Sequence, residues 1–267
     1  MADDVFDAEW LALRKRADHS ARSRSLVTVL RVEGRRRGWS RLVDLGAGTG
    51  SNLRYVSGRV PWAKEWILVD HDARLLDRVR APSHTVRVRT VEGDLATAGL
   101  AEVAEADVVT ASALLDLVSE EWLTALRDRC AEAGAAAYFA LSYDGMVRWH
   151  DSPSPDEDAL VLNAVNEHQR RDKGTGAALG PDATDAARRL FEDAGYTVRV
   201  EPSPWRLRGR RDAPLAEALV HGWATAALDM RPSDAGTIEG WREETVQRIR
   251  SGTVDLDVGH LDLLATP

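Results

Sequence analysis

The chain has 267 residues, of which 44% are hydrophobic and 29% are charged. These proportions are typical of a folded protein and exclude a disordered chain, because apolar side chains are frequent enough to build a core. With 35 Lys and Arg against 43 Asp and Glu, the formal net charge is −8 and the pI is about 5.4. An acidic balance disfavours nucleic acid as a partner, since binding to phosphates depends on cationic side chains.

The chain shows no sign of a membrane span or of a metal site. No apolar run reaches the ~18–20 residues that a membrane helix needs. The acidic start, MADDVFDAEW, lacks the basic and then apolar pattern of a signal peptide. Cys130 is the only cysteine, which excludes an internal disulfide and a cysteine-based zinc site. We therefore expect a cytoplasmic protein that needs no metal and contacts no membrane; a homodimer is left open.

The order of apolar runs predicts an α/β protein. Residues 5–38 are expected to be helical, and the short apolar runs that follow predict buried strands. Strands are expected at 41–45, 66–70, 85–91, 107–112 and 135–141, separated by helices at 51–59, 72–80, 95–104 and 119–133. This alternation is typical of a parallel sheet that helices cover on both faces.

The alternation is interrupted after residue 145. A polar, proline-rich loop at 151–158 and a helix at 157–171 lead into a glycine-rich stretch. The pattern then predicts helices at 182–194, 213–229 and 236–250. It predicts strands at 196–201 and 253–264. We expect a single domain with N-terminal helices at 1–38, a core at 39–145, an inserted cap at 146–181, and the rest of the sheet with extra helices at 182–267.

The most informative motif is LVDLGAGTGSN at residues 42–52, where a strand runs into a glycine-rich turn and then a helix. Asp70 ends the next strand, 20 residues after Gly50, where a carboxylate can accept hydrogen bonds from ribose hydroxyls. A dinucleotide site requires the spacing Gly-x-Gly-x-x-Gly, and Ser51 breaks it, which argues against NAD or FAD. A tight strand-to-helix turn without a ligand is the alternative.

In these motifs the chain resembles the class I, Rossmann-like S-adenosylmethionine-dependent methyltransferases. VDLGAGTG at 43–50 is similar to the first motif of that family, LVDHD at 68–72 to the second, and EGDL at 92–95 to the third. VVTASALLD at 108–116 is similar to the region after the fourth strand. The resemblance covers about residues 40–145. It implies a mostly parallel seven-stranded sheet, an N-terminal helical lid, a helical cap, and S-adenosylmethionine as the cofactor.

The resemblance also implies roles at the carboxyl ends of the strands. The glycine loop would wrap the methionine part of the cofactor, Asp44 would lie beneath its amino group, and Asp70 would hold the ribose. Asp94 could equally cap the helix that follows it, and Arg22 could lie on a solvent-facing helix surface. The cofactor-binding residues predicted in this way are Asp44, Gly46, Gly48, Gly50, Asn52, Asp70, His71, Asp94, Leu95, Ser112, Ala113 and Arg22.

Candidate acceptor-site residues lie in the polar stretch HQRRDK at 168–173. A general base is needed only when the methyl acceptor must lose a proton, and His168 is our candidate. Arg170 and Arg171 are predicted to bind an acidic substrate through paired hydrogen bonds. The alternative is a solvated helix end, in which basic residues are favourable for electrostatic reasons.

Three further residues are candidates for the same site. Asp116 follows the fourth strand and is predicted to orient the nucleophile, with a helix N-cap as the alternative. Tyr143 and Trp149 follow the fifth predicted strand and are expected to line the substrate pocket, with ordinary loop packing as the alternative. The sequence thus predicts transfer of a methyl group to O, N or S of a small polar or acidic molecule. An RNA or protein methyltransferase, or a non-catalytic cofactor-binding scaffold, is the alternative.

Overall fold

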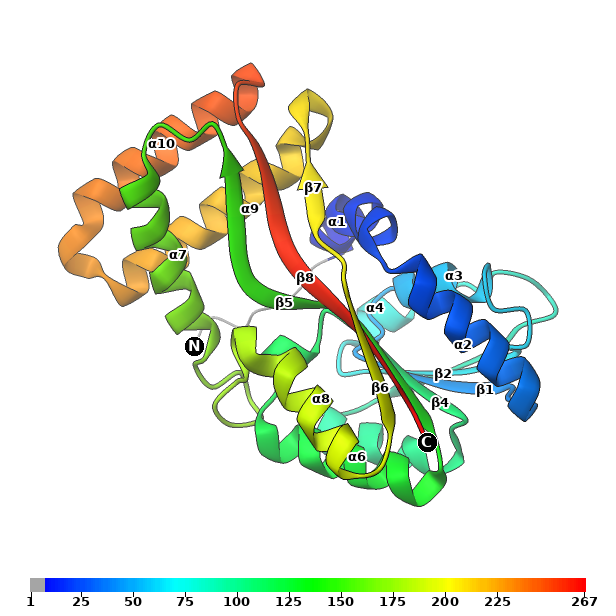
Figure 1. Cartoon of the computed structure of the whole chain (residues 1–267). Coiled ribbons are helices and arrows are strands. Elements are labelled where there is room, and N and C mark those ends of the chain that lie inside the picture. Colours follow the sequence, from blue (N-terminus) through cyan, green and yellow to red (C-terminus); the bar gives the residue numbers. More distant parts are fainter. Residues whose placement is uncertain (1–7) are drawn as a thin grey trace.

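The computed structural model describes residues 8–267 and is built around a mostly parallel sheet with helices on both faces (Figure 1). Along the sheet the strand order is β3-β2-β1-β4-β5-β8-β6. The strands are β1 (Arg41–Leu45), β2 (Glu65–Asp70), β3 (Arg87–Glu92), β4 (Val108–Ser112), β5 (Ala136–His150), β6 (Thr197–Pro202) and β8 (Asp255–Thr266). The start of the first predicted helix, residues 5–7, lies outside the described part.

The α/β class and the strands expected from the sequence are confirmed. The pairs of β1 with β2 and β4, β2 with β3, and β4 with β5 are parallel, whereas β8 runs antiparallel to both β5 and β6. An eighth strand, β7 (Trp205–Leu207), also pairs with β8. The sequence analysis missed it, because three residues are too few to display an alternating pattern.

Helices pack on the sheet in two layers that bury separate clusters of apolar side chains. One layer contains α2 (Arg24–Arg37) and α3 (Ser51–Ser57), and the other contains α6 (Glu120–Ala133) and α8 (Ala183–Asp193). α1 (Ala8–Ala21) precedes them, and α4 (Ala73–Leu76) follows β2 as a single turn. The helix predicted at 95–104 is instead a π-helical turn, the short α5 (Leu100–Glu102) and a 3₁₀ turn.

Local sequence signals set where the main helices begin and end. Ser23 and Ser119 cap α2 and α6, because their hydroxyls accept hydrogen bonds from Leu26 N and Trp122 N, both at 3.2 Å. Gly134 ends α6 with a φ of 65°, a left-handed conformation that glycine adopts without a steric penalty. These caps orient the helices so that their apolar faces meet the sheet.

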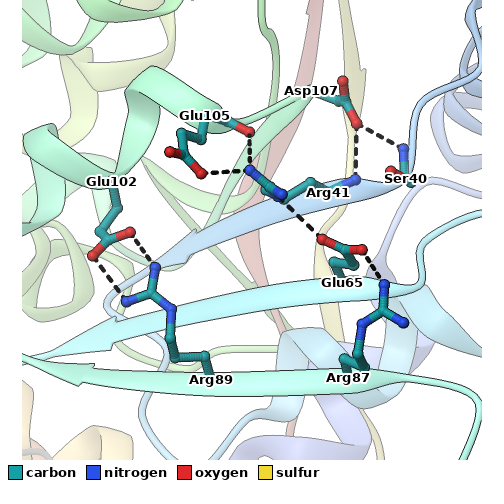
Figure 2. Close-up of polar contacts among 8 residues, drawn as sticks. All are labelled: Ser40, Arg41, Glu65, Arg87, Arg89, Glu102, Glu105 and Asp107. Atoms are coloured by element: carbon teal, nitrogen blue, oxygen red, sulfur yellow. Dashed lines mark hydrogen bonds and ion pairs between the residues drawn. The ribbon is translucent and has the colours of Figure 1, made fainter.

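Charged side chains tie together the strands of one half of the sheet at their amino ends (Figure 2). Glu65, which begins β2, accepts hydrogen bonds from Arg41 of β1 and Arg87 of β3. The Asp107 carboxylate accepts hydrogen bonds from the backbone amides of Ser40 and Arg41, at 2.7 and 2.8 Å. Each exposed pair contributes little, about 0–1 kcal/mol. Together they hold the register of three strands at the edge opposite to the glycine loop.

β5 is longer than the sequence predicts, because its antiparallel pairing with β8 continues to residue 150. The strand therefore contains Tyr143 and Trp149, which we had expected in a loop. Two shifts in the register of β5 and β8 accompany the bend of the strand that is visible in Figure 1. The cap accordingly begins after residue 150 and not at residue 146.

Three helices cover the extended part of β5 and β8 and form the cap (Figure 1). They are α7 (Pro155–Gln169), α9 (Gly209–Met230) and α10 (Ala235–Ser251), and α9 packs against the other two. We had placed the cap within 146–181. The structure corrects this, because α9 comes from the C-terminal part of the chain and packs beside α7 over the carboxyl ends of the strands.

Candidate active site

The turn between β1 and α3 has the geometry that its three glycines allow. Gly46, Gly48 and Gly50 have φ values of 64°, 52° and 78°, in the left-handed region that side chains disfavour. A Cβ atom on Gly46 or Gly48 would lie 3.1 Å from a side-chain carbon of Leu114 or Leu11 respectively. The glycine loop is thus closely covered by α1 and by the segment after β4.

Asp70, the last residue of β2, is bound to this loop. Its Oδ2 accepts a hydrogen bond from Gly48 N at 2.7 Å, and its Oδ1 accepts one from Asp72 N at 3.0 Å. The residue is only 6% exposed, yet it lines the cavity described below. Each carboxylate oxygen has a second lone pair, so Asp70 can still accept hydrogen bonds from the hydroxyls of a ligand. His71 beside it is largely exposed.

Asp44 lies in the sheet beneath the glycine loop and does not line the cavity. Its Oδ1 accepts hydrogen bonds from Asn52 Nδ2 at 2.6 Å and from Thr110 Oγ1 at 2.7 Å. Oδ2 has no hydrogen-bond partner among the described residues. Burial raises the pKa of Asp44 to about 6, and the hydrogen bonds and the charge of Arg22 oppose this rise. A buried oxygen without a partner is costly unless water or a ligand satisfies it.

Arg22 does not reach the cavity, which corrects the role predicted for it. It lies just after the end of α1, is 4% exposed, and packs its guanidinium 4.4 Å from the ring of Tyr55 and 5.3 Å from that of Tyr138. Burial between two rings also excludes the solvent-facing alternative.

A large cavity of about 1640 Å³ opens at the carboxyl ends of the strands. Its wall runs from α1 and the glycine loop past β2, β3 and β4 to the end of α7, the loop at 171–175, and α9. Single ligands usually occupy about 300–1,000 Å³, so the cavity has room for a cofactor and a second molecule. The predicted site residues in its wall are Gly46, Gly48, Asn52, Asp70, His71, Asp94, Leu95, Ser112, Ala113, His168 and Arg171.

Two of these wall residues have special local geometry. Asp94 accepts a hydrogen bond from Ala96 N at 2.6 Å, so it caps the following turn, as the alternative expected, and also lines the cavity. Ala113 has a φ of 53° and its N–H donates to Ala140 O at 2.8 Å. Such backbone strain in a residue with a side chain is often found at functional sites.

Residues from the cap meet at the other end of the cavity. His168 at the end of α7, Arg171 just after it, and Asp229 on α9 all line the wall. Arg171 pairs with Asp229, and His168 Nε2 lies 3.8 Å from Asp229 Oδ2. Arg170, by contrast, pairs with Asp182 at 2.9 Å and does not line the cavity. The predicted pair of arginines is therefore split, because consecutive residues after a helix point in different directions.

Arg14 and Asp18 on α1 form a part of the wall that the sequence analysis missed. Arg14 Nε donates to both carboxylate oxygens of Asp18, at 3.2 and 3.0 Å. The indole N–H of Trp205, on β7, donates to Asp18 at 3.1 Å, and the guanidinium of Arg14 lies 4.9 Å from the Trp205 ring. The spacing of four residues between Arg14 and Asp18 could have predicted an ion pair along the helix. It could not have predicted that this side of α1 faces the cavity.

Asp116 is buried beside the cavity without lining it. It is 7% exposed, burial raises the pKa of its carboxyl to about 6, and its Oδ1 has no hydrogen-bond partner among the described residues. It is not the N-cap of α6, since Ser119 takes that position.

Tyr143 and Trp149 lie outside the cavity wall, which corrects their predicted contact with substrate. Tyr143 donates from its hydroxyl to Asn166 Oδ1 at 3.0 Å and holds α7 to β5. The ring of Trp149 packs edge-on against those of Trp223 and Trp241, with centroids 6.1 and 6.2 Å away, between the strand and the cap helices. Both side chains therefore pack the cap onto the extended strand.

Residues 42–134 match a family model described as a methyltransferase domain. The matched segment contains the glycine loop, Asp70, Asp94 and the end of β4. This segment is therefore similar in sequence to methyltransferase domains. A search of curated proteins found no matching sequence.

Solved structures with a similar arrangement include a cyclopropane synthase and two methyltransferases. A cyclopropane synthase, MmaA2 from Mycobacterium tuberculosis, is 11% identical, with a TM-score of 0.44 over 99% of this chain and 87% of that one. An S-adenosylmethionine-dependent methyltransferase from Geobacter sulfurreducens, in complex with S-adenosylhomocysteine, is 16% identical, with a TM-score of 0.41 over 93% of each chain. CalO1, a methyltransferase in calicheamicin biosynthesis, is 22% identical, with a TM-score of 0.43 over 75% of this chain and 56% of that one.

The residues at the site fit the methyltransferase cofactor. Two of the three left-handed glycines of the loop, Gly46 and Gly48, line the cavity, and so does the buried carboxylate of Asp70. In the part of the chain that the structure describes, no cluster of three or more His, Cys, Asp and Glu residues could hold a metal. Within residues 8–267 no helix is long and apolar enough to span a bilayer.

Proposed function

We propose that the protein is an S-adenosylmethionine-dependent methyltransferase that acts on an O, N or S atom of a small polar molecule bound beneath α7 and α9. The observation that carries the proposal is the continuity of the cavity, whose wall joins the glycine loop and Asp70 to His168 and Arg171. A cavity larger than one ligand needs is consistent with cofactor and acceptor side by side.

The cofactor half of the cavity would be held by residues of the sheet. The amides of the glycine loop and the Asp70 carboxylate would bind the cofactor, with Asp94 and Leu95 beside its adenine. When bound, S-adenosylmethionine supplies a methyl group on a sulfonium, which is already a good donor. The main contribution of the protein is then to align the acceptor, and orientation can lower a barrier by about 7–11 kcal/mol.

His168 would take the proton of an acceptor hydroxyl or ammonium. Its imidazole belongs to the cap end of the cavity wall, and histidine is the side chain that most often serves as a general base. Asp116 stays a candidate for orienting the acceptor, because its buried carboxyl has an oxygen without a hydrogen-bond partner among the described residues, although it does not line the cavity.

The ion pairs of the cap favour an uncharged polar acceptor over an acidic one. Arg170 is paired with Asp182 outside the cavity, and Arg171 is paired with Asp229 inside it. Arg14 is likewise paired with Asp18. An anionic acceptor would have to break one of these pairs, at the cost of leaving a carboxylate without its partner.

A labelling experiment tests the proposal. The protein is incubated with a metabolite extract and S-adenosylmethionine that carries a trideuterated methyl group. We expect a small-molecule product that is heavier by the label, and at least a tenfold lower yield for His168→Ala. The control His84→Ala changes an exposed histidine outside the cavity wall. Label recovered only in RNA or protein, or in no product at all, would overturn the proposal.

A further inference from the structure

The carboxylate of Asp229, at the cap end of the cavity, lies close to the side chains of both His168 and Arg171. Asp229 lies in the last turn of α9, and both His168 and Arg171 approach it from α7 and the loop after it. All three line the cavity. α7 and α9 pack along each other, so the position of Asp229 relative to His168 is set by two helices and not by a loop.

We propose that Asp229 is a positioning residue that orients the imidazole of His168 and raises its proton affinity. This inference rests on the proposed role of His168 as the general base. A carboxylate beside a histidine favours the imidazolium form and holds one ring nitrogen as a donor. The sequence analysis did not single out Asp229, because 61 residues separate it from His168.

The geometry turns the Nε2 side of the His168 ring toward Asp229, and the proposal assigns the two ring nitrogens accordingly. His168 Nε2 is 3.8 Å from Asp229 Oδ2, within ion-pair range although longer than a hydrogen bond. With Nε2 carrying the hydrogen that faces Asp229, Nδ1 is the basic nitrogen. The acceptor proton would move to Nδ1 as the acceptor atom bonds to the methyl carbon, and the charge of the resulting imidazolium would be stabilised by Asp229.

Other charged groups among the described residues also lie near His168 and influence its pKa. Arg171 pairs with the same carboxylate and, as a cation, opposes protonation of the imidazole. Asp172 and Lys173, in the loop after α7, also line the cavity. Glu167 is paired with Arg231, and Arg170 is paired with Asp182. Asp229 and Arg171 should therefore shift the pKa of His168 in opposite directions.

A titration by NMR tests this in the full chain saturated with S-adenosylhomocysteine, with no acceptor present. His168→Gln identifies the resonances of His168. We expect Asp229→Asn to lower the pKa of His168 by about one unit, a typical effect of losing a nearby opposite charge, and Arg171→Gln to raise it. Asp182→Asn is the matched control, since it breaks an ion pair in the same segment outside the cavity, and it should leave the pKa unchanged.

Two results would overturn the inference: an unchanged pKa in Asp229→Asn, or an equal shift in Asp182→Asn. Because the titration needs no methyl acceptor, its outcome is separate from that of the labelling experiment. With an acceptor in hand, Asp229→Asn should lower kcat more than it raises KM and should move the acidic limb of the pH profile to lower pH. Asp229→Glu should restore much of the activity.

Discussion

The carboxylate of Asp70 accepts a hydrogen bond from the backbone amide of Gly48 across 2.7 Å, although 22 residues separate the two. The bond ties the carboxyl end of β2 to the glycine loop that follows β1. It also directs the buried acid toward the loop and into the cavity wall. The two strongest sequence signals for the cofactor are therefore parts of one structural unit.

Replacement of Asp70 by Ala should remove cofactor binding. The variant loses the acceptor for Gly48 N and the carboxylate proposed to bind the cofactor, and hydrogen bonds to charged groups contribute about 1.5–3 kcal/mol. We expect at least a tenfold higher Kd for S-adenosylhomocysteine by calorimetry and no rise in Tm on its addition. Asp77→Ala removes an exposed carboxylate nearby and should bind normally. An unchanged Kd in Asp70→Ala would contradict the assignment.

Asp116 should make the protein less stable as the pH rises. Burial raises the pKa of its carboxyl to about 6, above the ordinary 3.8. Because the folded pKa is the higher one, the contribution of Asp116 to stability is complete below pH 3.8 and is lost as the pH rises through 6. Relative to wild type, Asp116→Asn should therefore gain up to about 3 kcal/mol in unfolding free energy between pH 4 and 7.5.

Urea unfolding at several pH values measures this difference. The matched control is Asp185→Asn, since the Asp185 side chain is 82% exposed. Its unfolding free energy should run parallel to that of wild type. Parallel curves for Asp116→Asn as well would show that the carboxyl of Asp116 titrates as it does in the unfolded chain.

His260 should make the protein less stable as the pH falls, which is the opposite of the effect expected for Asp116. Burial, together with the charge of Arg14, lowers the pKa of this histidine from 6.5 to about 3. The stabilising contribution of His260 is complete above pH 6.5 and is lost as the pH falls from 6.5 toward 3. Over this range the histidine is protonated in the unfolded chain but stays neutral in the folded protein. His260→Phe keeps the aromatic packing beside Trp205 and Tyr143. Between pH 7.5 and pH 4.5 the unfolding free energy of the His260→Phe variant should fall by about 2–3 kcal/mol less than that of wild type.

Thermal or urea unfolding between pH 7.5 and 4.5 gives this comparison. His84→Gln, at an exposed position, should follow wild type over the whole range. If His260→Phe is destabilised by acid as much as wild type, then His260 is protonated in the folded protein and the packing around it must open.

The sequence by itself determined the strands β1 to β4, the glycine loop and the acid at the end of β2. Each of these depends on neighbours within a few residues. A run of apolar side chains indicates a buried strand, and a set of closely spaced glycines indicates a backbone turn that other residues disfavour. The order of such elements was enough to predict the sheet and the edge at which a ligand binds.

Only the tertiary structure decided which side chains meet at the cap. Arg170 and Arg171 are adjacent in the chain, yet one pairs with Asp182 and the other with Asp229. Arg22, just after the end of α1, enters the core, whereas Arg14, eight residues earlier on that helix, lines the cavity. A residue's ion-pair partner depends on how distant helices pack, and the local periodicity of a sequence carries no information about that.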